Sequence, residues 1–241
     1  MHASAPTSTR TDEVRAGLAD IAAPTLALVP IGLLFGAVAT ASGLSPAETV
    51  LMSGLVFAGG SQFAAIEIWA DPVPIAAIVF STLLINARHV LMSASLVPRT
   101  EAFAPWQRLV GLHFLADETW ALAERRAAAA RLTPAYWFAM IAVFFTTWMA
   151  TIAAGAALGA RLGDPARWGA DFAFPALFIA LVAALWKGPA TGIAVGASAP
   201  APAGAAPALG PPSPVPAGAI PGIPPAALVW RPGTAAEESA P

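Results

Sequence analysis

The segment 82–96, TLLINARHVLMSASL, places Asn86, Arg88 and His89 inside an otherwise apolar stretch. A charged side chain at the centre of a bilayer costs about 2.5–3.5 kcal/mol on insertion scales. If this segment crosses a membrane, its polar groups therefore need partners or water. On a helix, Asn86 and His89 share one face and Arg88 falls on an adjacent face. The pattern predicts a polar sector that faces protein or a water-filled cavity. A plainer alternative is that these side chains reach an interface or join two helices.

A second segment, 109–123, carries Asp117 and Glu118. A carboxylate within reach of Arg88 would offset part of the desolvation of both charges. We therefore expect one of these acidic groups to lie near Arg88. The alternative is a helix end that emerges into water, because Glu124 and two arginines follow closely.

A third segment, FAGGSQFAA at 57–65, combines Gly59 and Gly60 with Ser61 and Gln62. Each glycine weakens a helix by about 1 kcal/mol relative to alanine. Small residues could serve close helix packing. They could equally mark a broken helix whose backbone N–H groups hold a substrate carboxylate. The spacing alone leaves both interpretations open.

Several function classes have no support in the sequence. There is no cysteine, no P-loop, no HExxH and no GxSxG, and the three histidines are scattered. We therefore predict no metal site, no cofactor and no use of ATP by this chain. The net charge is -2 and no basic cluster is present, so nucleic acid is not an expected partner.

The composition predicts an integral membrane protein. Hydrophobic residues make up 57% of the chain and charged residues 11%, and the mean hydropathy is +0.69; soluble domains average about 25% charged residues. A membrane-crossing helix needs about 20 mostly apolar residues. We expect an all-α, polytopic helical bundle in the lipid bilayer with about six hydrophobic segments: Ile21–Ala41, Pro46–Trp69, Pro74–Leu96, Leu109–Ala123, Pro134–Leu158 and Phe172–Trp186.

Three regions follow from this pattern: an N-terminal arm at 1–20, a membrane domain at 21–187 and a tail at 188–241. Counting Lys and Arg in the expected loops gives six on the side of the N-terminus and four on the other, which favours a cytoplasmic N-terminus. The tail holds 13 of the 24 prolines and no periodicity. We expect it to be disordered or polyproline-like, with translation out of frame as a further hypothesis for its origin.

Taken in order, the blocks AGGSQFAA, NARHVLMSASL and ADETWAL resemble the AzlC family of branched-chain amino-acid permeases. The resemblance spans about residues 30–187, beyond which family members continue with hydrophobic sequence while this chain enters its Pro/Ala tail. It implies an exporter of valine, leucine or isoleucine in the bacterial inner membrane, working with a small AzlD-type membrane subunit. The shared positions, our candidates for substrate binding or coupling, are Ser61, Gln62, Asn86, Arg88, His89, Asp117 and Glu118.

We therefore expect a secondary transporter rather than an enzyme. Arg88 or the 59–61 backbone would bind the substrate carboxylate, and Asp117 or Glu118 its ammonium group. Histidine titrates near neutrality, so His89 with one of these acids is a hypothesis for proton coupling.

Three alternatives remain at this point. The first keeps the fold and moves another small metabolite. The second is a membrane-embedded enzyme with His89 and Asp117 as acid–base groups, for which no nucleophile or metal is evident. The third is a subunit that only docks a partner.

Overall fold

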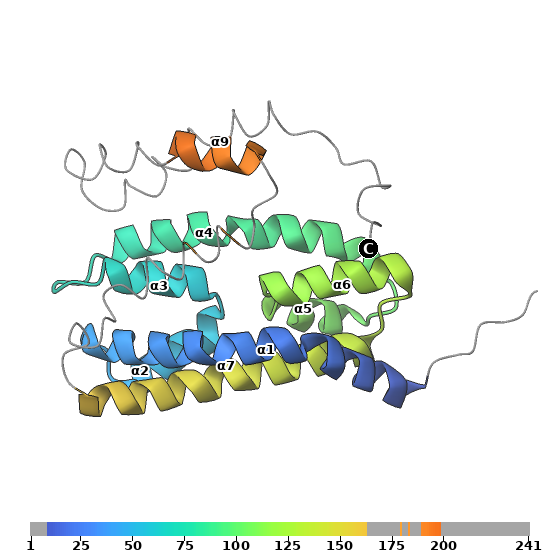
Figure 1. Cartoon of the computed structure of the whole chain (residues 1–241), viewed down its shortest axis with the longest axis horizontal. Helices are drawn as coiled ribbons and strands as arrows, with labels where there is room; N and C mark the ends of the chain where they lie inside the picture. The colour runs from blue at the N-terminus through green and yellow to red at the C-terminus, as the bar shows by residue number, and fades with distance from the viewer. Residues whose placement is uncertain (1–8, 163–178, 180–182, 184–188, 199–241) are drawn as a thin grey trace, which may run out of the picture. The chain divides into compact units, whose positions relative to one another are not determined.

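The computed structural model describes residues 9–162, 179, 183 and 189–198, and every regular element in them is a helix. Within this part of the chain, three helices are long and apolar enough to cross a membrane: α1 (Arg10–Ala41), α4 (Ile75–Leu96) with its 3₁₀ extension η1 (Val97–Arg99), and α7 (Pro134–Leu162) (Figure 1). They match the segments expected at 21–41, 74–96 and 134–158. The all-α class and the membrane-length helices are therefore confirmed.

Six uninterrupted spans are not confirmed. The segment expected at 46–69 consists of two helices, α2 (Pro46–Val56) and α3 (Gly59–Glu67). The short segment expected at 109–123 overlaps α5 (Pro105–His113) and α6 (Asp117–Ala129), which are separated by non-helical residues 114–116. Nearly all of the sixth segment, 172–186, lies outside the described residues. Two expected spans are thus discontinuous helices.

The chain divides into two compact units, Met1–Glu67 with Ile85–Ala173 and Ile68–Leu84 with Phe174–Pro241. The described part of the second unit contains residues 75–84 of α4 and the helix α9 (Pro189–Ser198). We expected no regular structure after residue 188, so α9 departs from that prediction. Its only proline stands at its first position, where the missing N–H costs little. Residues 199–241 lie outside the described residues.

The helix α1 begins at Arg10 instead of Ile21, so half of the expected N-terminal arm is helical. Thr9 and Asp12 form a capping box: the Thr9 hydroxyl accepts from the Asp12 N–H at 3.2 Å, and an Asp12 carboxylate oxygen accepts from the Thr9 N–H at 3.0 Å. Pro24 and Pro30 lie inside the helix without ending it. Prolines are tolerated in membrane helices when neighbouring helices supply packing and hydrogen bonds.

The helices α1 and α7 lie side by side and form the most extensive helix–helix contact in the described chain (Figure 1). Glycines allow the close approach. A Cβ on Gly36 would meet the backbone of Ile152, and a Cβ on Gly155 would meet the backbone of Leu33. This resembles the small-residue packing by which membrane helices associate. Phe35, Ala39, Ile152 and Ala156 are fully buried along this contact.

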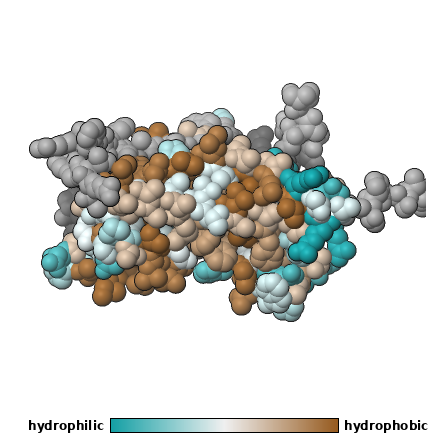
Figure 2. Space-filling model, turned by 90° about the horizontal axis from the view of Figure 1, so that it is seen from below, coloured by the Kyte–Doolittle hydropathy of each residue, from teal (hydrophilic) through white to brown (hydrophobic). Residues whose placement is uncertain are grey.

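Large apolar side chains are exposed on the helices of the first unit, and hydrophobic residues cover much of the face drawn in Figure 2. Such a surface is unfavourable in water but matches the hydrocarbon of a bilayer. Examples with more than 60% of their surface exposed are Leu26, Leu51, Leu55, Leu91 and Leu109.

Candidate functional site

An ion pair joins α4 to α6. A terminal guanidinium nitrogen (Nη1) of Arg88 lies 2.8 Å from Oδ2 of Asp117, with about two fifths of each side chain exposed in the isolated chain. The expected proximity of Arg88 to an acidic group of another segment is therefore confirmed, and Asp117 is that group. Glu118 is exposed and forms no salt bridge with a described residue. Removal of either partner would leave a charge without compensation.

Asp117 stands at the first position of α6, directly after a break in the chain. The Thr119 hydroxyl accepts from the N–H of Ala116 at 2.9 Å and donates to the carbonyl of the same residue at 3.0 Å, which fixes the start of the helix. A carboxylate is favourable there because the first N–H groups of a helix carry partial positive charge. A second contact ties α6 to α4, since the Trp120 indole N–H donates to the Ser95 hydroxyl at 2.9 Å.

The glycine-containing segment is interrupted between α2 and α3. Phe57 has φ 41°, a left-handed conformation that is rare for a bulky residue. The helix therefore stops at Val56 and restarts at Gly59. Gly59 and Gly60 occupy the first turn of α3, where a Cβ on Gly60 would lie 3.6 Å from Nη2 of Arg88. The expected break is therefore confirmed, and the binding of a substrate carboxylate by its N–H groups stays a prediction.

Gln62 and Ser61 hold this break together. The Gln62 side chain is fully buried; its Oε1 accepts from the Ala58 N–H at 3.3 Å and its Nε2 donates to the Ser53 hydroxyl at 2.7 Å. The Ser61 hydroxyl donates to the Ala58 carbonyl at 3.0 Å. Gln62 thus pairs a backbone N–H that the break would otherwise leave free, and Ser61 adds a second donor to a carbonyl that already accepts from the Gln62 N–H. In this structure they shape the break, and their part in substrate binding stays a proposal.

Replacing Gln62 with leucine should destabilise the protein. The substitution keeps the side-chain size but leaves the Ala58 N–H and the Ser53 hydroxyl without their amide partner. We expect a loss of about 1–3 kcal/mol, read as a lower melting temperature in detergent. Gln62→Glu retains an acceptor for the Ala58 N–H and should lose less if it stays protonated. Equal melting temperatures for Gln62→Leu and the unaltered protein would contradict this role.

Asn86 and His89 lie on the same α4 helix. Nδ1 of His89 is 3.2 Å from the backbone carbonyl oxygen of Asn86, which suits a tautomer with the proton on Nδ1. Oδ1 of Asn86 and Nε of Arg88 are buried atoms without a hydrogen-bond partner among the described residues. Buried polar atoms are usually paired in native proteins. The Asn86 side chain beside the Arg88–Asp117 pair therefore offers an acceptor without a partner, and Arg88 itself keeps one donor without a partner.

Three phenylalanines connect the two helix breaks. Phe57 at the first break contacts Phe114 at the second, with ring centroids 5.8 Å apart, and both contact Phe145 of α7, at 5.3 and 4.8 Å. All three pairs are edge-to-face, the arrangement favoured by aromatic quadrupoles. The breaks that carry the polar candidates are thus held together by an apolar cluster. Phe114 and Phe145 were not foreseen from the sequence.

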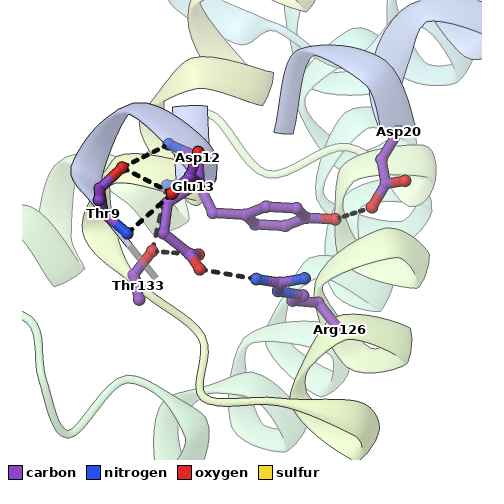
Figure 3. Close-up of polar contacts among 7 residues, drawn as sticks. Thr9, Asp12, Glu13, Asp20, Arg126 and Thr133 are labelled. Carbon is purple, nitrogen blue, oxygen red and sulfur yellow. Dashed lines mark hydrogen bonds and ion pairs between the residues drawn. The ribbon is translucent and has the colours of Figure 1, made fainter. Parts of the chain in front are cut away.

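A second polar network, at the start of α1, was missed from the sequence (Figure 3). Glu13 is 5% exposed; its carboxylate accepts from Arg126 at 2.7 Å and from the Thr133 hydroxyl at 2.8 Å. The Tyr136 hydroxyl donates to Asp20 at 2.6 Å. Arg126 lies on α6, which continues to Ala129. The network therefore holds the C-terminal end of α6, whereas Asp117 stands at its N-terminal end.

Glu13→Gln should weaken the contact between α1 and α6 that Glu13 and Arg126 form. The substitution removes the negative charge beside Arg126 while it keeps the side-chain shape. We expect a loss of roughly 1–3 kcal/mol in stability, measured as a lower melting temperature in detergent. Glu67→Gln, at an exposed position, is the matched control and should melt like the unaltered protein. A Glu13→Gln protein that melts with the control would show that the network does not stabilise the fold.

Known proteins resemble this chain over the segments that carry the site. The family model described as AzlC protein matches residues 24–162, which include both broken helices and the Arg88–Asp117 pair. The chain belongs to the AzlC family. This family is associated with transport. Within the described residues, no group of three His, Asp or Glu side chains is placed to hold a metal ion.

Curated relatives align over about two thirds of this AzlC-family chain. A branched-chain amino acid transport protein, AzlC, of Bacillus subtilis is 26% identical over 65% of this chain and 61% of its own length. The inner membrane protein YgaZ of Escherichia coli is 28% identical over 67% of this chain and 69% of its own length. An uncharacterized membrane protein of Archaeoglobus fulgidus is 28% identical over 68% of this chain and 71% of its own length. No solved structure matches.

Proposed function

We propose that this chain is a secondary transporter that exports branched-chain amino acids across the bacterial inner membrane, together with a small AzlD-type membrane subunit. The Arg88–Asp117 pair at 2.8 Å carries the proposal. It brings a cation and an anion together beside the breaks of two discontinuous helices. Interrupted helices of this kind are where many transporters bind substrate and coupling ions.

A zwitterion suits this pair because it carries both charges and can therefore pair with Arg88 and with Asp117 at the same time. The substrate carboxylate would take the place of Asp117 on the guanidinium of Arg88, with the first N–H groups of α3 close by. The substrate ammonium group would take the place of Arg88 on Asp117 and could use the free Oδ1 of Asn86. The exchange conserves charge, so neither residue is left without a charged partner.

The apolar substrate side chain would contact residues at the two breaks. Phe57, Phe63 and Met92 are at least 90% buried. The name of the Bacillus subtilis relative, branched-chain amino acid transport protein AzlC, supports aliphatic amino acids as the cargo. Hydrophobic pockets discriminate by about 1–3 kcal/mol per methylene, so leucine, isoleucine and valine would share one site.

The test is efflux of leucine and valine from preloaded cells that express the chain with and without a small AzlD-type subunit. Faster efflux than in cells with the empty vector supports the proposal, and equal efflux in all strains contradicts it. Vesicles with an imposed pH gradient test coupling through His89 and Asp117 or Glu118. Efflux that ignores the gradient would remove proton coupling while leaving the transport proposal in place.

A further inference from the structure

Trp148, in the middle of α7, has a buried indole N–H that the roles described above leave unexplained. The residue is 3% exposed, and its Nε1 has no hydrogen-bond partner among the described residues. Buried tryptophan N–H groups usually find an acceptor. Tryptophans of membrane proteins gather at the two interfaces, whereas this one stands 14 residues after Pro134 at the start of α7 and 14 before Leu162 at its end.

The indole ring spans the space between α1 and α3. On one side, its Cε3 lies 3.5 Å from the Cβ position of Gly32, and its rings stack on Phe35 with centroids 6.2 Å apart. On the other side, Cη2 and Cζ2 lie 3.4 and 3.7 Å from the Cβ position of Gly59. Within the indole, Nε1 and Cζ2 are both attached to Cε2. Nε1 itself lies more than 4 Å from the Cβ position of Gly59, on the same long edge of the indole as Cζ2.

Donors thus approach the start of α3 from two other helices. Gly59 faces Trp148 of α7, and Gly60 faces the guanidinium of Arg88 of α4, whose Nε is also unpartnered. The first N–H groups of α3 have no intrahelical acceptor. Gly59 and Gly60 carry no side chain that would fill the space and are half-buried. An anion with two oxygen atoms, such as a carboxylate, would satisfy donors on both sides of the helix.

We propose that the indole N–H of Trp148 is a binding group for the substrate carboxylate, opposite Arg88 across the first turn of α3. This inference rests on the proposed function, because it adds a residue to the same substrate site. The carboxylate would receive one hydrogen bond from α7 and one from α4. The binding of substrate would then connect α7 to the discontinuous helix α2–α3.

Trp148→Phe tests the proposal, since it removes the N–H while keeping an aromatic ring against Phe35. Leucine transport is measured in proteoliposomes that contain the full chain with its small subunit. We expect the KM for leucine to rise about tenfold, as for the loss of one hydrogen bond to a charged group. Trp137→Phe is the matched control: Trp137 lies on the same helix, is 1% exposed and adjoins Gly111 instead of Gly59. Its KM should not change.

Leucinamide, which lacks the carboxylate, tests what the N–H recognises. In the unaltered protein, leucine should inhibit labelled leucine transport more strongly than leucinamide does. Trp148→Phe should weaken inhibition by leucine about tenfold and leave inhibition by leucinamide unchanged. An equal loss for both compounds, or no loss for either, would overturn the proposal.

Gly59→Ala provides a second variant, should Trp148→Phe fail to fold. The added methyl group meets the indole at an ordinary contact distance of 3.4 Å, so the protein should still fold, but the methyl enters the proposed carboxylate space. The KM for leucine should rise severalfold, and an unchanged KM would overturn the proposal. A transporter of known cargo, reconstituted in the same way, is the control for the proteoliposomes. If that transporter works while the unaltered protein moves no leucine, the proposed function itself fails. This result differs from a changed or unchanged KM in one variant.

Discussion

Arg88→Ala is expected to reduce leucine efflux by a factor of about 10–150. The guanidinium is the central cation of the proposed site, and a hydrogen bond between charged groups contributes about 1.5–3 kcal/mol, which corresponds to that range of binding constants. The measurement is the initial rate of efflux divided by the amount of the protein in the membrane. Asp117→Ala should lose as much, because it leaves Arg88 without the carboxylate at 2.8 Å.

The control is Arg99→Ala, at an exposed position in η1, which continues directly from α4. It removes an equal charge away from the site and should transport like the unaltered protein. Arg88→Ala with an unaltered rate would contradict the proposed site. Loss of co-purification with the small subunit at an unaltered rate would instead identify a docking role for Arg88.

Gly155→Leu is expected to prevent the protein from accumulating in the membrane. A Cβ at this position would meet the backbone of Leu33, and backbone atoms cannot move aside as the end of a side chain can. Overpacking in a close contact costs about 1–3 kcal/mol or more, and here it would separate α1 from α7 along their length. The measurement is the amount of folded protein extracted in mild detergent, judged by size-exclusion chromatography.

Ala154→Leu is the matched control for this prediction, because Ala154 is the preceding residue on α7 and is exposed. It adds the same bulk on the surface of the helix and should leave the yield of folded protein unchanged. Normal yield and melting temperature for Gly155→Leu would show that the close contact between α1 and α7 does not determine the stability of the fold.

The sequence predicted the long helices and the ion pair because both follow from strong constraints. A run of about 20 apolar residues has few alternatives to a membrane helix, and α4 and α7 begin within one residue of the expected starts at 74 and 134. Likewise, the cost of an unpaired Arg88 in the membrane required an acidic neighbour. Whether Asp117 or Glu118 filled that role depended on where α6 begins, which spacing does not reveal.

The breaks were harder to locate because local pattern and tertiary packing disagree there. The glycines at 59 and 60 suggested a break at that point, yet the left-handed residue is Phe57, a position that backbone propensity alone disfavours. Gln62 and the contacts of Phe57 with Phe114 and Phe145 stabilise that conformation, and these contacts lie between residues distant in the sequence. The same long-range origin hid the break at residues 114–116.

Glu13 and Trp148 were missed for different reasons. Glu13 lies in a polar arm that a sequence reading assigns to solvent, although Glu13 and Asp20 are seven residues apart and so share one face of a helix. That spacing was a usable signal. Trp148 had only its position as a signal, a tryptophan far from both ends of an apolar helix. Its unpaired N–H appears only when the neighbouring helices are in place.

The rings of Phe57, Phe114 and Phe145 bear on whether protons can leak between the two helix breaks. They contain no group that can donate, accept or release a proton, so the three rings offer water molecules no polar partner where they meet between the two helix breaks. A continuous file of water would conduct protons and dissipate the membrane potential whether or not cargo was present. In the proposed proton-coupled export, a proton would therefore pass these three rings on other side chains or on the cargo itself.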